Sequence, residues 1–408
     1  MPALTMSRIA WRNLWRNRRR TGLALAAIGL SVALVLIYDG VLRWESDMML
    51  DTVTGPMLGH VQVHAPGWRR TRDMDKTLRH VDQSMAALRT DAAIADLSPR
   101  IYAPALAAVG EEGFAVLVLG VDQAAESRPS RLLAGVKMPG HGVLMGRALA
   151  EQMGVRAGAE IALVGQGVDG SLANALYTVT ALIETPVDFV NRQAVVMSLG
   201  EAQELFSMPG EAHEIVVYAR DPAQAGAIAG RWNGAGGLDG AEVLDWKTLA
   251  PAMVDIIELV GVAWVFVLVL VLIAAAAGVA NTMLMATFER THEFGMLLAL
   301  GTSPARIVYM ILLESLALGV VGVIAGTFLG SALVAWAHST GVDYAALTGG
   351  GPSQLSAFGM NLSLRMYPHL EWIDIVRVVV AVMATTVLAS AWPAARAARL
   401  QPVRALRD

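Results

Sequence analysis

Four windows of the sequence are long and apolar enough to cross a lipid bilayer, which limits the folds that the chain can adopt. A helix needs about 20 apolar residues to span the hydrocarbon core. The windows cover residues 21–43, 251–286, 304–337 and 373–395. Because 55% of the 408 residues are hydrophobic and only 16% are charged, the chain is too apolar for a soluble globular protein of this size. We therefore expect an α-helical membrane protein with four transmembrane helices.

Residues 44–250, between the first and second windows, have the composition of a soluble domain. Short runs rich in β-branched residues alternate there with short helical patterns. We predict strands at 59–64, 114–122, 160–165, 175–184, 192–199 and 213–219. The helical patterns cover 82–90, 146–155, 200–206 and 221–232. The segment is long enough to fold by itself, so we expect an α+β domain, inserted between the first two transmembrane helices and made of two subdomains.

Arginine asymmetry indicates the orientation of the spans. Residues 1–20 carry six arginines and no acid, and the tail at 396–408 carries four arginines and one acid. Because basic flanks stay in the cytoplasm, we expect both termini and the connection at 287–303 to be cytoplasmic. The inserted domain and the loop at 338–372 would then lie outside the cytoplasm. We expect residues 1–20 to form a basic amphipathic helix at the membrane surface, and the first apolar run to be a retained span, since no convincing signal-peptide cleavage site follows it.

Several kinds of chemistry are missing from the sequence. A phosphate-binding P-loop needs a lysine directly after a glycine, and none of Lys76, Lys137 and Lys247 meets that condition. We therefore expect no ATP hydrolysis by this chain. It has no cysteine, and no carboxylate lies at ligand spacing from His60 and His64, so no metal site is predicted. The net charge of −4 gives no indication of nucleic-acid binding.

Glu314 is an ionisable residue inside the third window, about ten residues from its start. Such a residue is by default a candidate functional group. A single intramembrane carboxylate without a second titratable group makes a poor proton relay, which favours a structural residue that faces another helix. Gly319, Gly322, Gly326 and Gly330 form a small-residue stripe in the same window, and we expect this stripe to pack against another helix, in this chain or in a second one.

The connection at 289–301, "ERTHEFGMLLALG", interrupts two apolar windows with mixed charge. If it is helical, Glu289, Glu293, Met296 or Leu297, and Leu300 lie on one side, and Arg290 and Phe294 share the adjoining strip. Mixed charge beside an apolar edge is more typical of a helix that binds a protein groove than of one that lies in lipid.

Residues 281–307, which contain this connection, resemble the signature of the FtsX-like, or MacB-type, permeases of ATP-binding cassette (ABC) transporters. The segments 10–34 and 392–408 are similar to the two ends of that family, and 143–165 resembles its periplasmic core. Within the family, "GHVQVHAPGW" (59–68), "AHEIVVYARDP" (212–222) and the long segment 341–372 look most like the lipoprotein-releasing, LolC/LolE-like branch.

The resemblance implies a mechanism called mechanotransmission, in which ATP hydrolysis by a separate cytoplasmic ATPase dimer moves the permease helices and, through them, the periplasmic domains. It implies two permease chains, identical or paralogous, in the inner membrane of a bacterium, with ATP and Mg on the ATPase and no cofactor on this chain. The substrate would be a lipoprotein or another amphiphile, and a periplasmic carrier or adaptor is a further candidate partner.

The resemblance also implies two groups of site residues. A coupling helix that contacts the ATPase would comprise Glu289, Arg290, Glu293, Phe294, Gly295, Met296, Leu300 and Gly301. The family commonly has a basic residue where this chain has His292. A substrate cavity between the two permeases would be lined by Val41, Trp44, Met48, Met253, Ile256, Ile257 and Val260.

Two other functions fit the same resemblance. An FtsX-like regulator would activate a periplasmic cell-wall hydrolase without moving any substrate, and an efflux permease would export a drug or a peptide. A membrane-bound hydrolase that acts alone is disfavoured, because the sequence shows no nucleophile or metal constellation.

Overall fold

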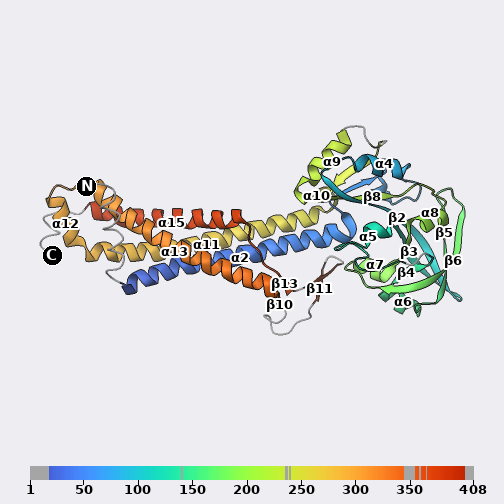
Figure 1. Ribbon diagram of the computed structural model, residues 1–408, viewed down its shortest axis with the longest axis horizontal. Helices are drawn as coiled ribbons and strands as arrows, with labels where there is room; N and C mark the ends of the chain where they lie inside the picture. The colour runs from blue at the N-terminus through green and yellow to red at the C-terminus, as the bar shows by residue number, and fades with distance from the viewer. Residues whose placement is uncertain are drawn as a thin grey trace. The chain divides into compact units, whose positions relative to one another are not determined.

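The computed structural model describes residues 18–138, 141–234, 238, 240–343, 354–357, 360–363 and 365–399 (Figure 1). The predicted amphipathic helix at 1–20 and the tail at 396–408 lie mostly outside these residues. The chain divides into two compact units. The helical unit comprises Met1–Ser46, Ile257–Gly350 and Arg365–Asp408, and the inserted unit comprises Asp47–Ile256 and Gly351–Leu364.

Four helices in the described part of the chain are long and apolar enough to span a membrane. They are α2 (Arg18–Val53), α11 (Pro251–Glu289), α13 (Pro304–Thr340) and α15 (Trp372–Ala398). The prediction of four spans with a domain between the first two is confirmed. All four helices extend beyond the predicted windows, and α2 continues ten residues past position 43. Charged residues end a lipid-compatible window, but Glu, Arg and Met are good helix formers and do not end the helix.

The helix ends follow local sequence signals. Pro304 occupies the first turn of α13, where its missing N–H costs no hydrogen bond. Glu371 and Asp374 form a capping box that opens α15. The short helix α12 (Thr291–Ala299) lies between α11 and α13, and Gly301 follows it with φ of +86°, a conformation that favours glycine. Strands β10 (Val342–Asp343) and β13 (Arg365–Met366) pair beyond the end of α13.

The glycines of α13 bring its backbone close to α2. A Cβ atom built on Gly326 would lie 2.4 Å from the carbonyl oxygen of Gly29, and one built on Gly322 would lie 2.7 Å from Ile28. Gly319 faces α15 instead, where a Cβ would lie 3.1 Å from Thr386. The predicted small-residue stripe therefore packs helices of the same chain against one another.

The inserted unit is built on one nine-stranded sheet in the order β3-β7-β4-β6-β5-β2-β8-β1-β9. The strands are β1 (Val61–His64), β2 (Ile94–Val109), β3 (Glu112–Val121), β4 (Val143–Gly146), β5 (Glu160–Gln166), β6 (Leu172–Ile183), β7 (Ala194–Ser198), β8 (Glu214–Ala219) and β9 (Glu242–Asp245). Strand β2 also pairs with β3, so six strands from β3 to β2 close into a ring. The remaining strands β8, β1 and β9 extend from the first half of β2, and β2 therefore belongs to both predicted subdomains.

Helices flank both parts of this sheet. They are α3 (Trp68–Thr71), α4 (Val81–Leu88), α5 (Gln123–Glu126), α6 (Arg147–Met153), α7 (Asp188–Gln193), α8 (Leu199–Leu205), α9 (Ala225–Gly234) and α10 (Trp246–Leu249). All six predicted strands are present, but the longest strand, β2, was not among them. Strand β2 contains Pro99 and Pro104, and a proline in a segment argues against its assignment as a central strand. A small hairpin of β11 (Gln354–Ala357) and β12 (Met360–Ser363) completes the unit.

Candidate functional site: the bend between α11 and α13

Arg290 lies at the bend between α11 and α12 and is almost completely buried. Its Nε donates a hydrogen bond to Glu293 at 3.0 Å, and its Nη1 donates one to Glu314 of α13 at 2.9 Å. The guanidinium carbon lies 5.0 Å from the centre of the Phe294 ring. One cation thus joins the connection to the next long helix, and Glu314, which sequence reasoning left without a titratable partner, is ion-paired.

Phe294 anchors the bend in the core of the helical unit. Only 1% of its surface is exposed, and it belongs to a cluster with Ile307 and Ile311 of α13 and with Ala394 and Ala397 of α15. Gly295 is buried beside it. Arg290, Phe294 and Gly295 therefore lie inside the chain, and their assignment to a coupling helix stays a prediction.

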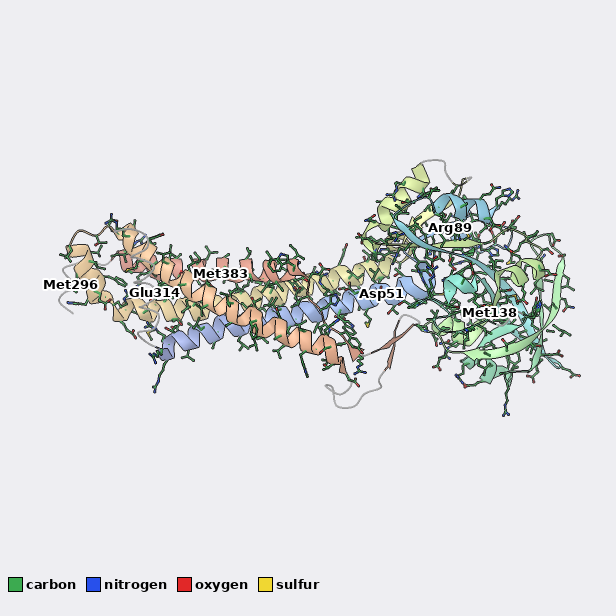
Figure 2. The ribbon with its side chains drawn as sticks, in the orientation of Figure 1. Asp51, Arg89, Met138, Met296, Glu314 and Met383 are labelled. Atoms are coloured by element: carbon green, nitrogen blue, oxygen red, sulfur yellow. The ribbon has the colours of Figure 1, made fainter. Side chains whose placement is uncertain are left out.

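The exposed side of α12 includes Met296 and Leu300, which the sequence placed on one side, together with His292. His292, Met296 and Leu300 follow one another at spacings of four residues and are all exposed, with 46% of Met296 and 82% of Leu300 accessible. Figure 2 shows Met296 at the bend and Glu314 farther along α13. Residues four apart lie on one helix face, so we define these three residues as the α12 face.

The predicted acidic residues are held at the edges of this face. Glu289 accepts a hydrogen bond from Arg20 of α2 at 2.5 Å, and Glu293 is paired with Arg290. Both side chains remain about half exposed. They can contribute to the charge of the surface while they also hold the bend together.

The predicted cavity residues are divided between the two compact units. Val41, Trp44, Ile257 and Val260 belong to the helical unit, and Met48, Met253 and Ile256 belong to the inserted unit. Met253 is buried, and the other six are half-buried.

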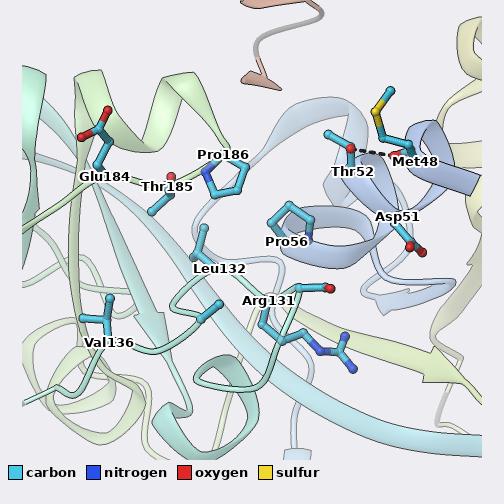
Figure 3. A pocket seen from close by; sticks show the side chains of 12 residues that line it. Met48, Asp51, Thr52, Pro56, Arg131, Leu132, Val136, Glu184, Thr185 and Pro186 are labelled. Atoms are coloured by element: carbon cyan, nitrogen blue, oxygen red, sulfur yellow. Dashed lines mark hydrogen bonds between the residues drawn. The ribbon is translucent and has the colours of Figure 1, made fainter. Parts of the chain in front are cut away.

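Met48 lines a pocket of about 400 Å³ in the inserted unit (Figure 3). Its lining is mainly apolar, with hydroxyl groups and three charged residues. It includes Pro56, Arg131, Leu132, Val136, Thr185 and Pro186. Burial lowers the pKa of Arg131 to about 10, so this side chain stays protonated at neutral pH.

The two histidines that sequence reasoning considered as metal ligands have structural roles. His60 Nδ1 accepts a hydrogen bond from the Ala219 N–H at 2.9 Å, and His64 is buried beside Trp68. No group of three or more His, Cys, Asp or Glu side chains among residues 18–399, as far as they are described, is placed to hold a metal ion.

Two family models match this chain. The model described as the MacB-like periplasmic core domain matches residues 21–234, and the one described as the FtsX-like permease C-terminal matches residues 265–402. This chain belongs to the FtsX-like, MacB-type family of ABC transporter permeases. It is a permease subunit of an ABC transporter, and its domain between α2 and α11 is a MacB-like periplasmic core domain.

The permease is also similar to individual relatives. The lipoprotein-releasing system transmembrane protein LolE of Haemophilus influenzae is 24% identical over 98% of both chains. LolC of Neisseria meningitidis is 22% identical over 65% of this chain and 64% of that protein. The solved periplasmic region of MacB from Actinobacillus actinomycetemcomitans, 10% identical, aligns with a TM-score of 0.35 over 50% of this chain and 97% of that one.

Proposed function

We propose that this permease couples ATP hydrolysis by a partner ATPase dimer to the extraction or release of a lipoprotein or another amphiphile at the periplasmic face of a bacterial inner membrane. The names of its LolC and LolE relatives support the substrate class. Both termini and α12 would be cytoplasmic, and the inserted domain periplasmic. The permease would act with a second permease chain and a periplasmic carrier, and it would leave ATP and Mg to the ATPase.

The observation that carries the proposal is the construction of the bend. The α12 face exposes Met296 and Leu300, two large apolar side chains, at the surface of a short helix between two spans. Apolar side chains at a polar surface are typical of protein contacts. A partner that bound this face would hold the ends of α11 and α13 together.

Displacement of α12 would reach the rest of the helical unit through two contacts. The Arg290–Glu314 ion pair links the bend to α13, and Phe294 packs against α13 and α15. Packed cores and buried ion pairs resist local deformation. A force on α12 would therefore move these helices together instead of bending the connection.

The pocket beside Met48 supports an amphiphile as substrate. Its lining combines methionine, leucine, valine and proline with hydroxyl groups and the charged Arg131. Methionine adapts to apolar groups of different shape. This combination suits a ligand with an apolar part and a polar part.

The test is to replace Leu300 with Asp in the complex with its ATPase. A charge at the centre of an apolar contact is expected to lower the copurification of the ATPase about tenfold. ATP-dependent release of substrate from membrane vesicles should fall in parallel.

The matched control is Leu172→Asp, which changes a leucine of similar exposure in the inserted unit. This variant should retain the ATPase. If Leu300→Asp also retained it at the wild-type level, the α12 face would not be the ATPase contact.

A further inference from the structure

The end of α2 is embedded in the inserted unit. The helix continues from Val53 into the π-helical turn Thr54–Leu58 and stops at Gly59, whose φ is +63°. The chain then enters β1, which lies between β8 and β9 in the sheet. A helix that ends inside a protein leaves carbonyl groups that need hydrogen-bond donors.

Arg100 of β2 supplies most of these donors. Its Nη1 donates to the carbonyl oxygen of Met57 at 2.7 Å, and its Nη2 donates to that of Pro56 at 2.9 Å. The hydroxyl of Tyr218, in β8, donates to the carbonyl oxygen of Gly55 at 3.0 Å. Three consecutive carbonyl groups at the helix end are thus held by two neighbouring strands.

Glu126 holds Arg100 in the orientation that these bonds require. The carboxylate accepts from Arg100 Nε at 2.8 Å, from the hydroxyl of Ser98 and from the N–H of Leu132. Arg100 is only 1% exposed, and Glu126 is completely buried. A cation at a helix C-terminus is also favoured by the helix dipole.

Two glycines allow the helix end to approach the domain closely. A Cβ on Gly55 would lie 2.4 Å from the carbonyl oxygen of Ser130, and one on Gly59 would lie 2.3 Å from Val216. Ser130 belongs to the same loop as Leu132, which Glu126 binds. The helix end therefore contacts the loop of Ser130 on one side and β8 on the other. Arg100 is connected to both, through Glu126 and through Tyr218.

A buried ion pair of this kind adds little to stability compared with apolar packing, but it requires one geometry. The guanidinium group has a rigid fork of donors, and here the fork binds three groups at once: the helix end, the Tyr218 hydroxyl of β8 and the Glu126 carboxylate. Since α2 is one continuous helix from Arg18, whatever moves it acts on these bonds.

We propose that Arg100 is a positioning residue that fixes the end of α2 in the inserted domain, so that displacement of α2 is passed to the domain. The proposal rests on the mechanotransmission function proposed above. It identifies Arg100 as the residue through which α2 would move the domain. Arg100 contacts no substrate in this role, and a variant should separate ATP hydrolysis from substrate release.

The first measurement needs neither ATP nor substrate. The chain has no cysteine, so spin labels can be placed at Asp51→Cys in α2 and Glu151→Cys in α6, both exposed. We expect the distance distribution between the labels to broaden in Arg100→Gln, because glutamine cannot replace the fork. Tyr218→Phe, which leaves the ion pair intact, should broaden it less and remains informative if Arg100→Gln does not fold.

The control is Thr180→Val, which removes a half-buried hydroxyl of β6 from its bond with the Val143 carbonyl oxygen and leaves the bonds of Arg100 unchanged. The distribution should keep its wild-type width in this variant. A distribution in Arg100→Gln as narrow as in the wild type would overturn the proposal.

The second measurement is substrate release by the complete complex. Arg100→Gln should lower ATP-dependent release about tenfold while ATP hydrolysis persists, and Arg100→Lys should recover part of it. Normal release despite a broadened distribution would also overturn the proposal. If the wild-type complex itself released no substrate, the proposed function would fail, and the distance measurement alone would decide the role of Arg100.

Discussion

The role of Glu314, a carboxylate in a membrane span, becomes clear from its ion-pair partner. An unpaired carboxylate in an apolar span costs free energy, and the sequence suggests either a functional group or a structural one. In the structure Arg290 lies 2.9 Å away and pairs with it. The partner comes from the connection between helices and not from a span, which is why a search of the spans does not find it.

Phe294 leads to a prediction about stability. Phe294→Ala should lower the free energy of unfolding by about 3–5 kcal/mol, because it leaves a cavity between α12, α13 and α15. Met296→Ala, on the exposed α12 face, should stay within about 0.5 kcal/mol of the wild type. Denaturant unfolding of the detergent-solubilised chain measures both. Equal stability of the two variants would mean that the bend is not anchored by Phe294.

His213 leads to a prediction about pH. Burial lowers its pKa, and the nearby Arg72 lowers it further, although a hydrogen bond with the Met74 carbonyl opposes the shift. The unfolded chain therefore binds a proton more readily, and the stability that neutral His213 contributes is present above its ordinary pKa of about 6.5 and lost as the pH falls below that value.

The measurement is the unfolding temperature of the full chain between about pH 7 and pH 5. His213→Gln should be less stable than the wild type at neutral pH and should lose less stability on acidification. An identical pH dependence in both proteins would show that His213 does not contribute to it. Comparison of the two slopes also removes the contribution of Glu214, whose pKa burial raises.

At the scale of elements, the packing of α2 on α13 depends on backbone contact. Gly326→Ala should destabilise the helical unit by about 1–3 kcal/mol, because the new Cβ would lie 2.4 Å from the Gly29 carbonyl oxygen. Gly261→Ala in α11 is the control, since nothing lies within 4 Å of a Cβ there. It should be neutral or slightly stabilising. Thermal unfolding in detergent compares the two, and the reverse order would exclude close α2–α13 packing.

Hydrophobic periodicity predicted six of the nine strands of the large sheet and missed β2, β4 and β9, of which β2 is the longest. This strand alternates little, contains two prolines and is rich in alanine. Pro99 and Pro104 nevertheless occupy ladder positions opposite Ile215 and Leu117. Strand β2 forms because it pairs with β3, β5 and β8 at once, and pairing between distant segments overrides local propensity.

At the scale of the whole molecule, the orientation of the chain remains a prediction that labelling can test. The chain has no cysteine, so single cysteines at Gln152, exposed in α6, and at His292, exposed in α12, report on the two sides. A membrane-impermeant maleimide should label Gln152→Cys in spheroplasts and His292→Cys only after permeabilisation. The opposite pattern would reverse the proposed topology.

The sequence alone determined the four spans, the inserted α+β domain and the family, because length, apolar windows and local motifs are properties of contiguous residues. The tertiary structure decided which side of α12 is exposed, which residue pairs with Glu314 and how Arg100 holds the end of α2. Arg290 and Glu314 are 24 positions apart in the chain, and Pro56 and Arg100 are 44 positions apart. Burial and ion pairing depend on such distant neighbours, and the sequence pattern of one segment does not predict them.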